Sequence, residues 1–454
     1  MIPVLTPSEM GEVDHHAPEP VEVLITRAGA AVERAAIALL GGSYGRRVVV
    51  LVGGGNNGND GRDAARRLAR RGVRVEVIEV AAAPDTLPAA DLVIDAAFGT
   101  GFRGSYRPPA LDRPTPILAV DIPSGVDGLT GAVPGDAWPA TRTVTFAALK
   151  PGLLFEPGRS LAGEVTVADI GLDVGTALTG VVEADDVTGW LPPRSPSAHK
   201  WQSAVWVVAG SPGMHGAAAL AAGGAQRAGA GYVRQSSPGA GPSGPLPLEV
   251  VQTSLEPEGW ASTVLAQSDR FGALVVGNGL GLAASTKTEV ARLVAATTVT
   301  TVVDGDGLTA LADAVASDPA VVVGPRVILT PHDGEFLRLA GHAPGPDRIA
   351  ATRALASRLG CVVLLKGGPE VVAHPDGRAL VVTTGDARLA TAGTGDVLAG
   401  VIGALAAAGV EPWHAAAAGA FLHGAAGALG WRHGLVAGDL LDHLPAVLDR
   451  LHTR

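Results

Sequence analysis

The stretch Ala390-Thr391-Ala392-Gly393-Thr394-Gly395-Asp396 runs directly into the apolar segment 397–405. The apolar segment predicts a buried helix, and the glycines before it predict a turn at the helix start. Unpaired N–H groups and the positive end of the helix dipole make such a start an anion site. A carboxylate there can accept a proton from a hydroxyl while the N–H groups hold phosphate charge, which is the minimum that phosphoryl transfer requires. The alternative is that Asp396 only caps the helix.

The composition indicates a layered α/β protein. The chain has 454 residues, which predicts two or three domains, and it is 47% hydrophobic with 62 glycines. A net charge of -10 and a pI near 5.6 argue against a nucleic-acid binder. The start of the chain lacks a signal-peptide pattern and no apolar segment has the length of a membrane helix, so we expect a cytoplasmic protein without membrane partners. The single cysteine, Cys361, lies in an apolar segment and is expected to be buried.

The first half of the chain contains a strand–loop–helix–strand unit. Segment 47–52 predicts a strand, 53–61 a loop rich in glycine and asparagine, 62–71 a helix and 73–80 the next strand. Such a unit places its loop at the carboxyl edge of a parallel sheet, where open α/β sheets bind ligands. The amide and carboxylate groups of this loop are able to hold a polar ligand or a cation. The alternative is a turn made of residues that tolerate positive φ.

Two aspartates, Asp95 and Asp121, end the next two apolar strands of the first half. Enzymes with α/β folds place working carboxylates at such positions, although either residue could instead cap a helix. Glycine-bearing segments follow at 99–104 and 122–128. Three polar loops at successive strand ends predict a shared pocket.

A polar, proline-bearing stretch at 186–198 predicts a linker between a first domain, 1–185, and a second, 199–454. The second domain repeats strand, polar loop and helix, which predicts a mostly parallel sheet covered on both faces. The stretch 236–247, rich in glycine and proline, is expected to be a long exposed loop. The expected strands of this domain are 204–209, 273–276, 301–303, 327–330 and 361–365.

Three further side chains of the second domain invite an interpretation. Lys366 follows an apolar strand and precedes two glycines, so it suits a phosphate contact, unless it is an ordinary surface lysine. His332 follows a strand end and either binds substrate or is a simple loop histidine. His423 lies on an apolar helix and is interpreted as a packed core histidine.

The first half resembles the NAD(P)H-hydrate epimerase family in the runs 55–61, 95–101, 121–127 and 143–152. The resemblance implies a Rossmann-like three-layer α/β domain in which Asp121 works at the reacting carbon. It also implies a potassium ion bound by Asn57, Asp95 and Ser124. The hydrated nicotinamide nucleotide would be held by Asn56, Asn57, Gly58, Asn59, Asp60, Gly99, Thr100, Gly101, Phe102, Arg103, Gly104 and Ser105.

The second half resembles the ribokinase-like NAD(P)H-hydrate dehydratase family in the runs 209–218, 277–281, 329–335, 366–368 and 392–396, which occur in the expected order. The resemblance implies a ribokinase-like three-layer α/β domain with Asp396 as the catalytic base. ADP would be the co-substrate, with Mg²⁺ bridging its phosphates. The phosphates would lie on Lys366, Gly367, Gly368, Pro369, Glu370 and Gly395, and the hydrated nucleotide near Ala217, Gly279, His332 and Asp396.

Both resemblances imply one repair function for hydrated NADH and NADPH, abbreviated NADHX and NADPHX. The first domain would epimerise the R and S hydrates, and the second would dehydrate the S form with ADP to give NAD(P)H, AMP and phosphate. Two alternatives stay open: a ribokinase-like small-molecule kinase with an accessory domain, and a nucleotide-binding protein whose catalysis has decayed, for which Asn59 and Glu370 are the relevant departures. Members of the family that the chain resembles tend to assemble, so the resemblance also implies a homo-oligomer.

Overall fold

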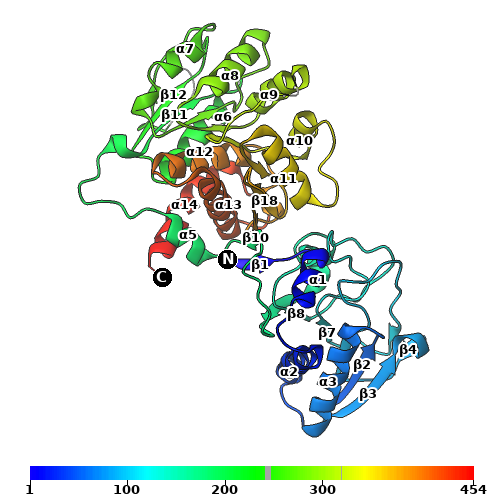
Figure 1. Ribbon diagram of the computed structural model, residues 1–454. Coiled ribbons are helices and arrows are strands. Elements are labelled where there is room, and N and C mark those ends of the chain that lie inside the picture. The colour runs from blue at the N-terminus through cyan, green and yellow to red at the C-terminus, as the bar shows by residue number, and fades with distance from the viewer. Residues whose placement is uncertain (241–246, 319, 454) are drawn as a thin grey trace. The chain divides into compact units, whose positions relative to one another are not determined.

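The computed structural model describes residues 1–240, 247–318 and 320–453, and the chain divides into two compact units (Figure 1). The N-terminal unit is Ile2–Thr179, and the C-terminal unit comprises Met1 and Gly180–Arg454. The division therefore falls before the boundary that we placed at 185. Helix α5 (Ala184–Trp190) occupies the first part of the expected linker 186–198, and its Val187 is buried in the core of the C-terminal unit. Half of the stretch 236–247, predicted as a loop, lies outside the described residues, namely 241–246.

The N-terminal unit contains a parallel sheet with the strand order β3-β2-β5-β7-β8-β9. Strand β2 has the bounds predicted from its β-branched run, and the carboxyl ends of β2, β5, β7 and β8 lie at one edge. The strands are β2 (Arg47–Val52), β3 (Arg74–Glu79), β5 (Leu92–Ala96), β7 (Ile117–Val120), β8 (Arg142–Phe146) and β9 (Glu164–Ala168).

The two faces of this sheet are covered differently. Helices α2 (Val21–Leu40) and α3 (Asn56–Arg70) pack side by side on one face (Figure 1). The opposite face packs against Tyr106, Trp138 and the short ladder of β4 (Thr86–Leu87) with β6 (Ala110–Leu111). On this face the third layer therefore consists of loops and the short β4–β6 ladder in place of helices. The remaining elements are β1 (Ile2–Val4), α1 (Pro7–His15), α4 (Gly158–Ala162), the 3-10 turns Val80–Ala82 and Pro151–Leu153, and β10 (Thr179–Val181), which crosses the boundary between the units.

Helix α3 begins at Asn56, six residues before the predicted start at Arg62, so the expected loop 53–61 was wrong for residues 56–61, which are helical. The reason is close packing on the sheet. A Cβ at Gly58 would lie 2.0 Å from the Gly53 carbonyl oxygen, and one at Gly61 would lie 2.5 Å from the Ala96 Cβ. These glycines have no side chain, which lets the first two helical turns lie directly on the strand ends.

The C-terminal unit contains a larger sheet with the order β19-β18-β17-β16-β15-β14-β11-β12-β13. Strands from β11 to β17 are parallel, as predicted, whereas β18 and β19 pair antiparallel at one side. The strands are β11 (Ala204–Val208), β12 (Tyr232–Ser236), β13 (Val251–Gln252), β14 (Ala273–Val276), β15 (Thr300–Val303), β16 (Val327–Leu329), β17 (Val362–Leu365), β18 (Glu370–Ala373) and β19 (Ala379–Val382).

Helices cover both faces of this sheet, which confirms the predicted three layers (Figure 1). One face carries α5, α6 (His215–Arg227), α12 (Thr394–Ala407), α13 (Pro412–Leu429) and α14 (Ala437–His452). The other carries α7 (Trp260–Leu265), α8 (Ala284–Ala296), α9 (Asp306–Ser317), α10 (Asp333–Ala340) and α11 (Arg348–Leu359). The short 3-10 turns are Lys200–Ser203, Ser268–Arg270 and Ala387–Leu389.

Helices α6 and α12 approach each other through glycine. A Cβ at Gly400 would lie 2.0 Å from the Ala221 carbonyl oxygen, and one at Gly224 would lie 2.4 Å from the Val397 carbonyl oxygen. Backbone therefore packs on backbone along this helix pair. Since α12 also packs on β11, β14 and β15, its start is held firmly against the sheet.

The single cysteine lies immediately before β17 and is fully buried, and this burial raises the pKa of its thiol.

No helix within residues 1–240, 247–318 and 320–453 is long and apolar enough to cross a membrane.

Candidate functional sites

The start of α12 has the predicted form of an anion site. Gly393 is the N-cap with φ +90°, and the Thr394 hydroxyl donates to the Leu389 carbonyl at 2.9 Å. The first turn contains Asp396, whose Oδ1 accepts a hydrogen bond from Asn278 Nδ2 at 2.8 Å. The Asp396 carboxylate is therefore oriented toward the strand ends and not into the helical layer.

A hydrogen-bonded network links Asp396 to the ends of neighbouring strands. Asn278 follows β14 and donates to Asp304 Oδ2 at 2.9 Å, while Lys366 follows β17 and donates to Asp304 Oδ1 at 2.8 Å. The Thr330 hydroxyl, after β16, also donates to Asp304 Oδ1 at 2.8 Å. Since β14, β15, β16 and β17 are adjacent and parallel, their carboxyl ends bring these side chains together. No role was predicted from the sequence for Asp304, which accepts hydrogen bonds from both Asn278 and Lys366 and so links the predicted base to the predicted lysine.

The charges of this network favour a base next to a cation. Burial raises the pKa of Asp396 to about 6, with the Asn278 hydrogen bond opposing the shift, the Asp304 charge adding to it and Lys366 opposing it. Burial by itself would lower the pKa of Lys366, but the Asp304 and Glu335 carboxylates outweigh it and raise the pKa. Lys366 is thus a cation, and Asp396 becomes a carboxylate base above about pH 6.

The predicted phosphate residues Lys366 and Gly395 lie together. A Cβ at Gly395 would be 3.4 Å from Lys366 Nζ, so the ammonium and the helix start border the same spot. Gly367 and Gly368 are exposed, and Pro369 is buried. Glu370 begins β18, and burial raises the pKa of its carboxyl to about 8, with Lys366 opposing. A protonated Glu370 does not repel a phosphate at neutral pH.

The structure places the predicted hydrate-binding residues of this unit in two positions. Gly279 has φ +62°, and a Cβ there would lie 3.0 Å from the Ala217 Cβ, so these two residues are neighbours. His332 is the N-cap of α10, and its Nδ1 accepts from the N–H groups of Gly334 and Glu335 at 3.0 and 3.2 Å. One ring nitrogen of His332 is therefore used by the helix cap. His423 is buried in α13, and burial lowers its pKa to about 4, in agreement with a core histidine.

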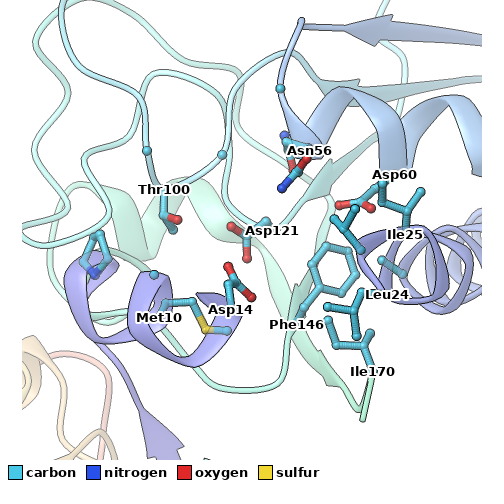
Figure 2. Close-up of a pocket in the computed structure, with 18 of the residues that line it drawn as sticks. Met10, Asp14, Leu24, Ile25, Asn56, Asp60, Thr100, Asp121, Phe146 and Ile170 are labelled. Carbon is cyan, nitrogen blue, oxygen red and sulfur yellow. The ribbon is translucent and has the colours of Figure 1, made fainter. Parts of the chain in front are cut away.

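The N-terminal unit contains a pocket of about 920 Å³ at the carboxyl edge of its sheet (Figure 2). Eight of the predicted binding and catalytic residues line it: Asn56, Asn57, Asp60, Gly99, Thr100, Gly101, Phe102 and Asp121. Gly58, Asn59, Arg103, Gly104 and Ser105 are not in this lining. Gly58 instead packs on Gly53, and Arg103 donates to the Thr100 and Phe102 carbonyls.

Asp121 is held in an unusual backbone conformation and paired with a lysine. Its φ is +67°, and its Oδ1 accepts from Lys150 Nζ at 2.7 Å and from the Thr145 hydroxyl at 3.0 Å. The Lys150 side chain is only 1% exposed and also donates to the Phe146 carbonyl. The sequence comparison of 143–152 contained Lys150 without assigning it a role. The sequence feature that could have identified Lys150 is its position as a lysine within an apolar run that continues from a strand end.

Asp95, Ser124 and Asn57 have the chemistry of a cation site. The Asp95 carboxylate is fully buried and accepts from the Ser124 hydroxyl at 2.6 Å and from the Ser124 N–H at 2.9 Å. Both polar atoms of the Asn57 side chain are buried and lack a hydrogen-bond partner among the described residues. An amide oxygen without a partner is available as a ligand for a hard cation.

Two further carboxyl groups face the same pocket. Asp60, from α3, is 8% exposed, and burial together with the charges of Asp121, Asp63 and Asp14 raises its pKa to about 8. Asp14, from α1, was missed because its helix shows no motif around it. Asp14 is exposed at the pocket wall, but its partial desolvation raises its pKa, Lys150 opposes this and Asp121 adds to it.

The two folds and sites define a two-domain α/β enzyme with a ribokinase-like second unit. Family models agree with this division: the model described as NAD(P)H-hydrate dehydratase matches residues 205–448, and the model described as YjeF-related protein N-terminus matches 21–87 and 80–152.

Whole-chain relatives give the family. The bifunctional NAD(P)H-hydrate repair enzyme Nnr of Moorella thermoacetica is 37% identical and covers 99% of this chain and 97% of its own. The protein of the same name from Escherichia coli K12 is 33% identical over 90% of this chain and 87% of its own. The chain belongs to the bifunctional NAD(P)H-hydrate repair enzyme family.

Solved structures match the C-terminal unit. The ADP/ATP-dependent NAD(P)H-hydrate dehydratase of Bacillus subtilis, co-crystallized with ATP and Mg²⁺, is 29% identical, with a TM-score of 0.51 over 60% of this chain and 98% of that chain. A ribokinase-like superfamily protein of Enterococcus faecalis has a TM-score of 0.52 at 18% identity over 62% of this chain, which supports the fold alone.

Proposed function

We propose that the protein repairs hydrated NADH and NADPH in two steps. The N-terminal unit interconverts the R and S hydrates, and the C-terminal unit dehydrates the S form with ADP to give NAD(P)H, AMP and phosphate. The single observation that carries this proposal is the Asp396 carboxylate at the start of α12, linked through Asn278 and Asp304 to Lys366. Family membership supplies the substrate class.

In the C-terminal unit, Asp396 accepts the proton of the substrate's ring hydroxyl as the hydroxyl oxygen attacks the terminal phosphate of ADP. The N–H groups at the start of α12 and the Lys366 ammonium stabilise the charge of the transferring group. Phosphate is a better leaving group than hydroxide, so its elimination restores the dihydronicotinamide. We place the ADP phosphates on Lys366–Glu370 and Gly395, and the hydrate near Ala217, Gly279 and His332.

A magnesium ion bound with the nucleotide would neutralise phosphate charge. Among the described residues no group of three or more His, Cys, Asp or Glu side chains is arranged to hold a metal. This fits a Mg²⁺ that is held mainly by phosphate oxygens and water, as nucleotide-bound Mg²⁺ usually is.

In the N-terminal unit, we propose that Asp121 acts at the hydrated carbon and that Asn57, Asp95 and Ser124 hold a potassium ion. The orphaned Asn57 side chain and the buried Asp95 carboxylate support a cation there. The potassium ion would fix the loops after β5 and β7, since the Ser124 hydroxyl donates to Asp95 and accepts from the Phe98 N–H. We further propose that the enzyme is a cytoplasmic homo-oligomer, which light scattering after size-exclusion chromatography would test.

Replacing Asp396 by Asn tests the carrying observation. The amide cannot accept the proton, so ADP-dependent recovery of reduced-nicotinamide absorbance should fall by about 10²–10⁴-fold. Interconversion of the R and S hydrates should continue at the wild-type rate, which serves as the internal folding control.

An Asp396→Asn protein with wild-type dehydration would contradict the assignment. A stable phosphorylated product formed with ATP would instead favour the small-molecule kinase. Binding of ADP without any turnover by the wild-type protein would favour the decayed nucleotide-binding protein.

A further inference from the structure

Two carboxylates from separate elements face each other across the N-terminal pocket. Asp14 comes from the last turn of α1 and Asp121 from the end of β7, and Figure 2 shows both side chains pointing into the same space. No described side chain makes an ion pair or hydrogen bond with the Asp14 carboxylate, which therefore remains available to a ligand. The charged or titratable groups that line the pocket are Asp14, His15, Glu19, Asp60, Asp121 and Lys150.

One ammonium group serves both carboxylates. Lys150 Nζ bonds Asp121 at 2.7 Å, and its charge also acts on Asp14. A single cation balances one carboxylate, so the second carboxylate retains a proton more readily. The pKa of Asp14 is raised: Asp14 is exposed at the pocket wall, but its partial desolvation raises the pKa first, Lys150 opposes the shift and the Asp121 charge adds to it.

We propose that Asp14 and Asp121 are an acid–base pair that carries protons to and from the ring hydroxyl during epimerisation. This inference rests on the proposed epimerase function. It assigns to Asp14 a catalytic role, with Lys150 as the positioning residue that keeps Asp121 in place.

The chemistry of the hydrate requires such a pair. Water adds to the enamine double bond of a dihydronicotinamide at the carbon next to the ring nitrogen. Asp14 donates a proton to the hydroxyl, the C–O bond breaks, water leaves, and the nitrogen lone pair forms a C=N⁺ bond. Water then adds from the opposite face, a new C–O bond forms, and Asp121 accepts the proton that is released. One water leaves, one enters, and the reverse reaction exchanges the two roles.

Asp60 is the competing proton donor, and its position argues for a different role. It lies on α3, one turn after Asn56 and Asn57, where we place the nucleotide and the potassium ion. Asp14 reaches the pocket from α1 and faces Asp121 (Figure 2), whereas Asp60 shares its helix with those nucleotide and potassium residues. We therefore assign the acid role to Asp14.

The test uses the full chain with the Asp14→Asn substitution. Separated R and S hydrates are mixed with enzyme without ADP, and their interconversion is followed by chromatography. Without the acid, the epimerisation kcat should fall by about 100-fold or more with little change in KM. The wild-type rate should decrease as the pH rises past the raised pKa of Asp14 and this acid loses its proton, and the decrease should be absent from the residual rate of Asp14→Asn. Asp14→Glu should recover part of the rate.

Glu12→Gln is the matched control, because Glu12 lies on the same helix but not in the pocket lining, and its epimerisation should be unchanged. Three results would overturn the pair: unchanged epimerisation by Asp14→Asn, a change in KM alone, or loss of the decrease with rising pH in Asp60→Asn but not in Asp14→Asn. A wild-type protein that does not interconvert the hydrates would contradict the proposed function instead.

Discussion

Burial raises the pKa of Asp396, and two neighbouring groups partly offset the shift. The resulting pKa determines the pH range in which the residue can accept a proton. A fully exposed aspartate is a weak base at neutral pH, whereas a carboxyl whose pKa is about 6 is a better proton acceptor and is still mostly ionised at pH 7. The Asn278 hydrogen bond and the Lys366 charge keep this pKa from rising further. The environment therefore matches the residue to the removal of a proton from a hydroxyl.

The pH dependence of dehydration follows from the same pKa. The proposed base, Asp396, must be ionised, so kcat/KM for the hydrate should rise with pH and level off above about pH 6. Initial rates of ADP-dependent recovery of NADH, measured from pH 5 to 8 with saturating ADP, check this. In Asp304→Asn, which removes a charge that raises the Asp396 pKa, the midpoint should move to lower pH; a midpoint that moves upward would contradict the network.

At the scale of the element, the start of α12 has room for one added methyl group at Gly395 without a change in the fold. Gly395 lies inside the helix, and a Cβ there contacts Lys366 Nζ at 3.4 Å without overlap. Gly395→Ala should therefore keep or raise the Tm, since alanine favours a helix. The added methyl would occupy the position that we propose for a phosphate, so the Kd for ADP should increase at least tenfold by calorimetry, equivalent to about 1.4 kcal/mol. Unchanged ADP affinity would move the phosphate away from this turn.

The contact between α6 and α12 makes a second element-scale prediction. Gly400→Ala would push a methyl against the Ala221 carbonyl and should destabilise the C-terminal unit by about 1–3 kcal/mol. Gly216→Ala is the control, because it lies on α6 and a Cβ there meets nothing within 4 Å. Urea unfolding followed by circular dichroism compares the two variants, and equal stability would contradict direct backbone packing.

Elements were predictable from the sequence where hydrophobic pattern and turn residues agreed. The parallel strands and the helix after Gly393 follow from apolar runs that end in glycine, and so did the placement of Asp121 and Lys366 at strand ends. The start of α3 was not predictable, because asparagine and glycine favour turns and only tertiary packing on Ala96 turns them helical. Asp14, Lys150 and Asp304 take their meaning from partners distant in the sequence, which no local pattern reveals.

On the scale of the whole molecule, each unit has its own hydrophobic core, so the two should respond separately to a ligand. ADP at 100 times its Kd should stabilise the C-terminal unit by about 2.7 kcal/mol. Calorimetry should then show one heat-unfolding transition that shifts upward with ADP and another that stays fixed. Equal shifts of both transitions would indicate that the units unfold as one.

The position of the only thiol has a practical consequence. Cys361 is fully buried immediately before β17, and burial raises the pKa of its thiol, so maleimide dyes should not react with it in the native protein. A cysteine introduced at an exposed position, such as that of Glu12, would then be the single labelling point. Fluorophores could be attached one at a time without first removing native cysteines, which makes this enzyme suitable for single-molecule fluorescence.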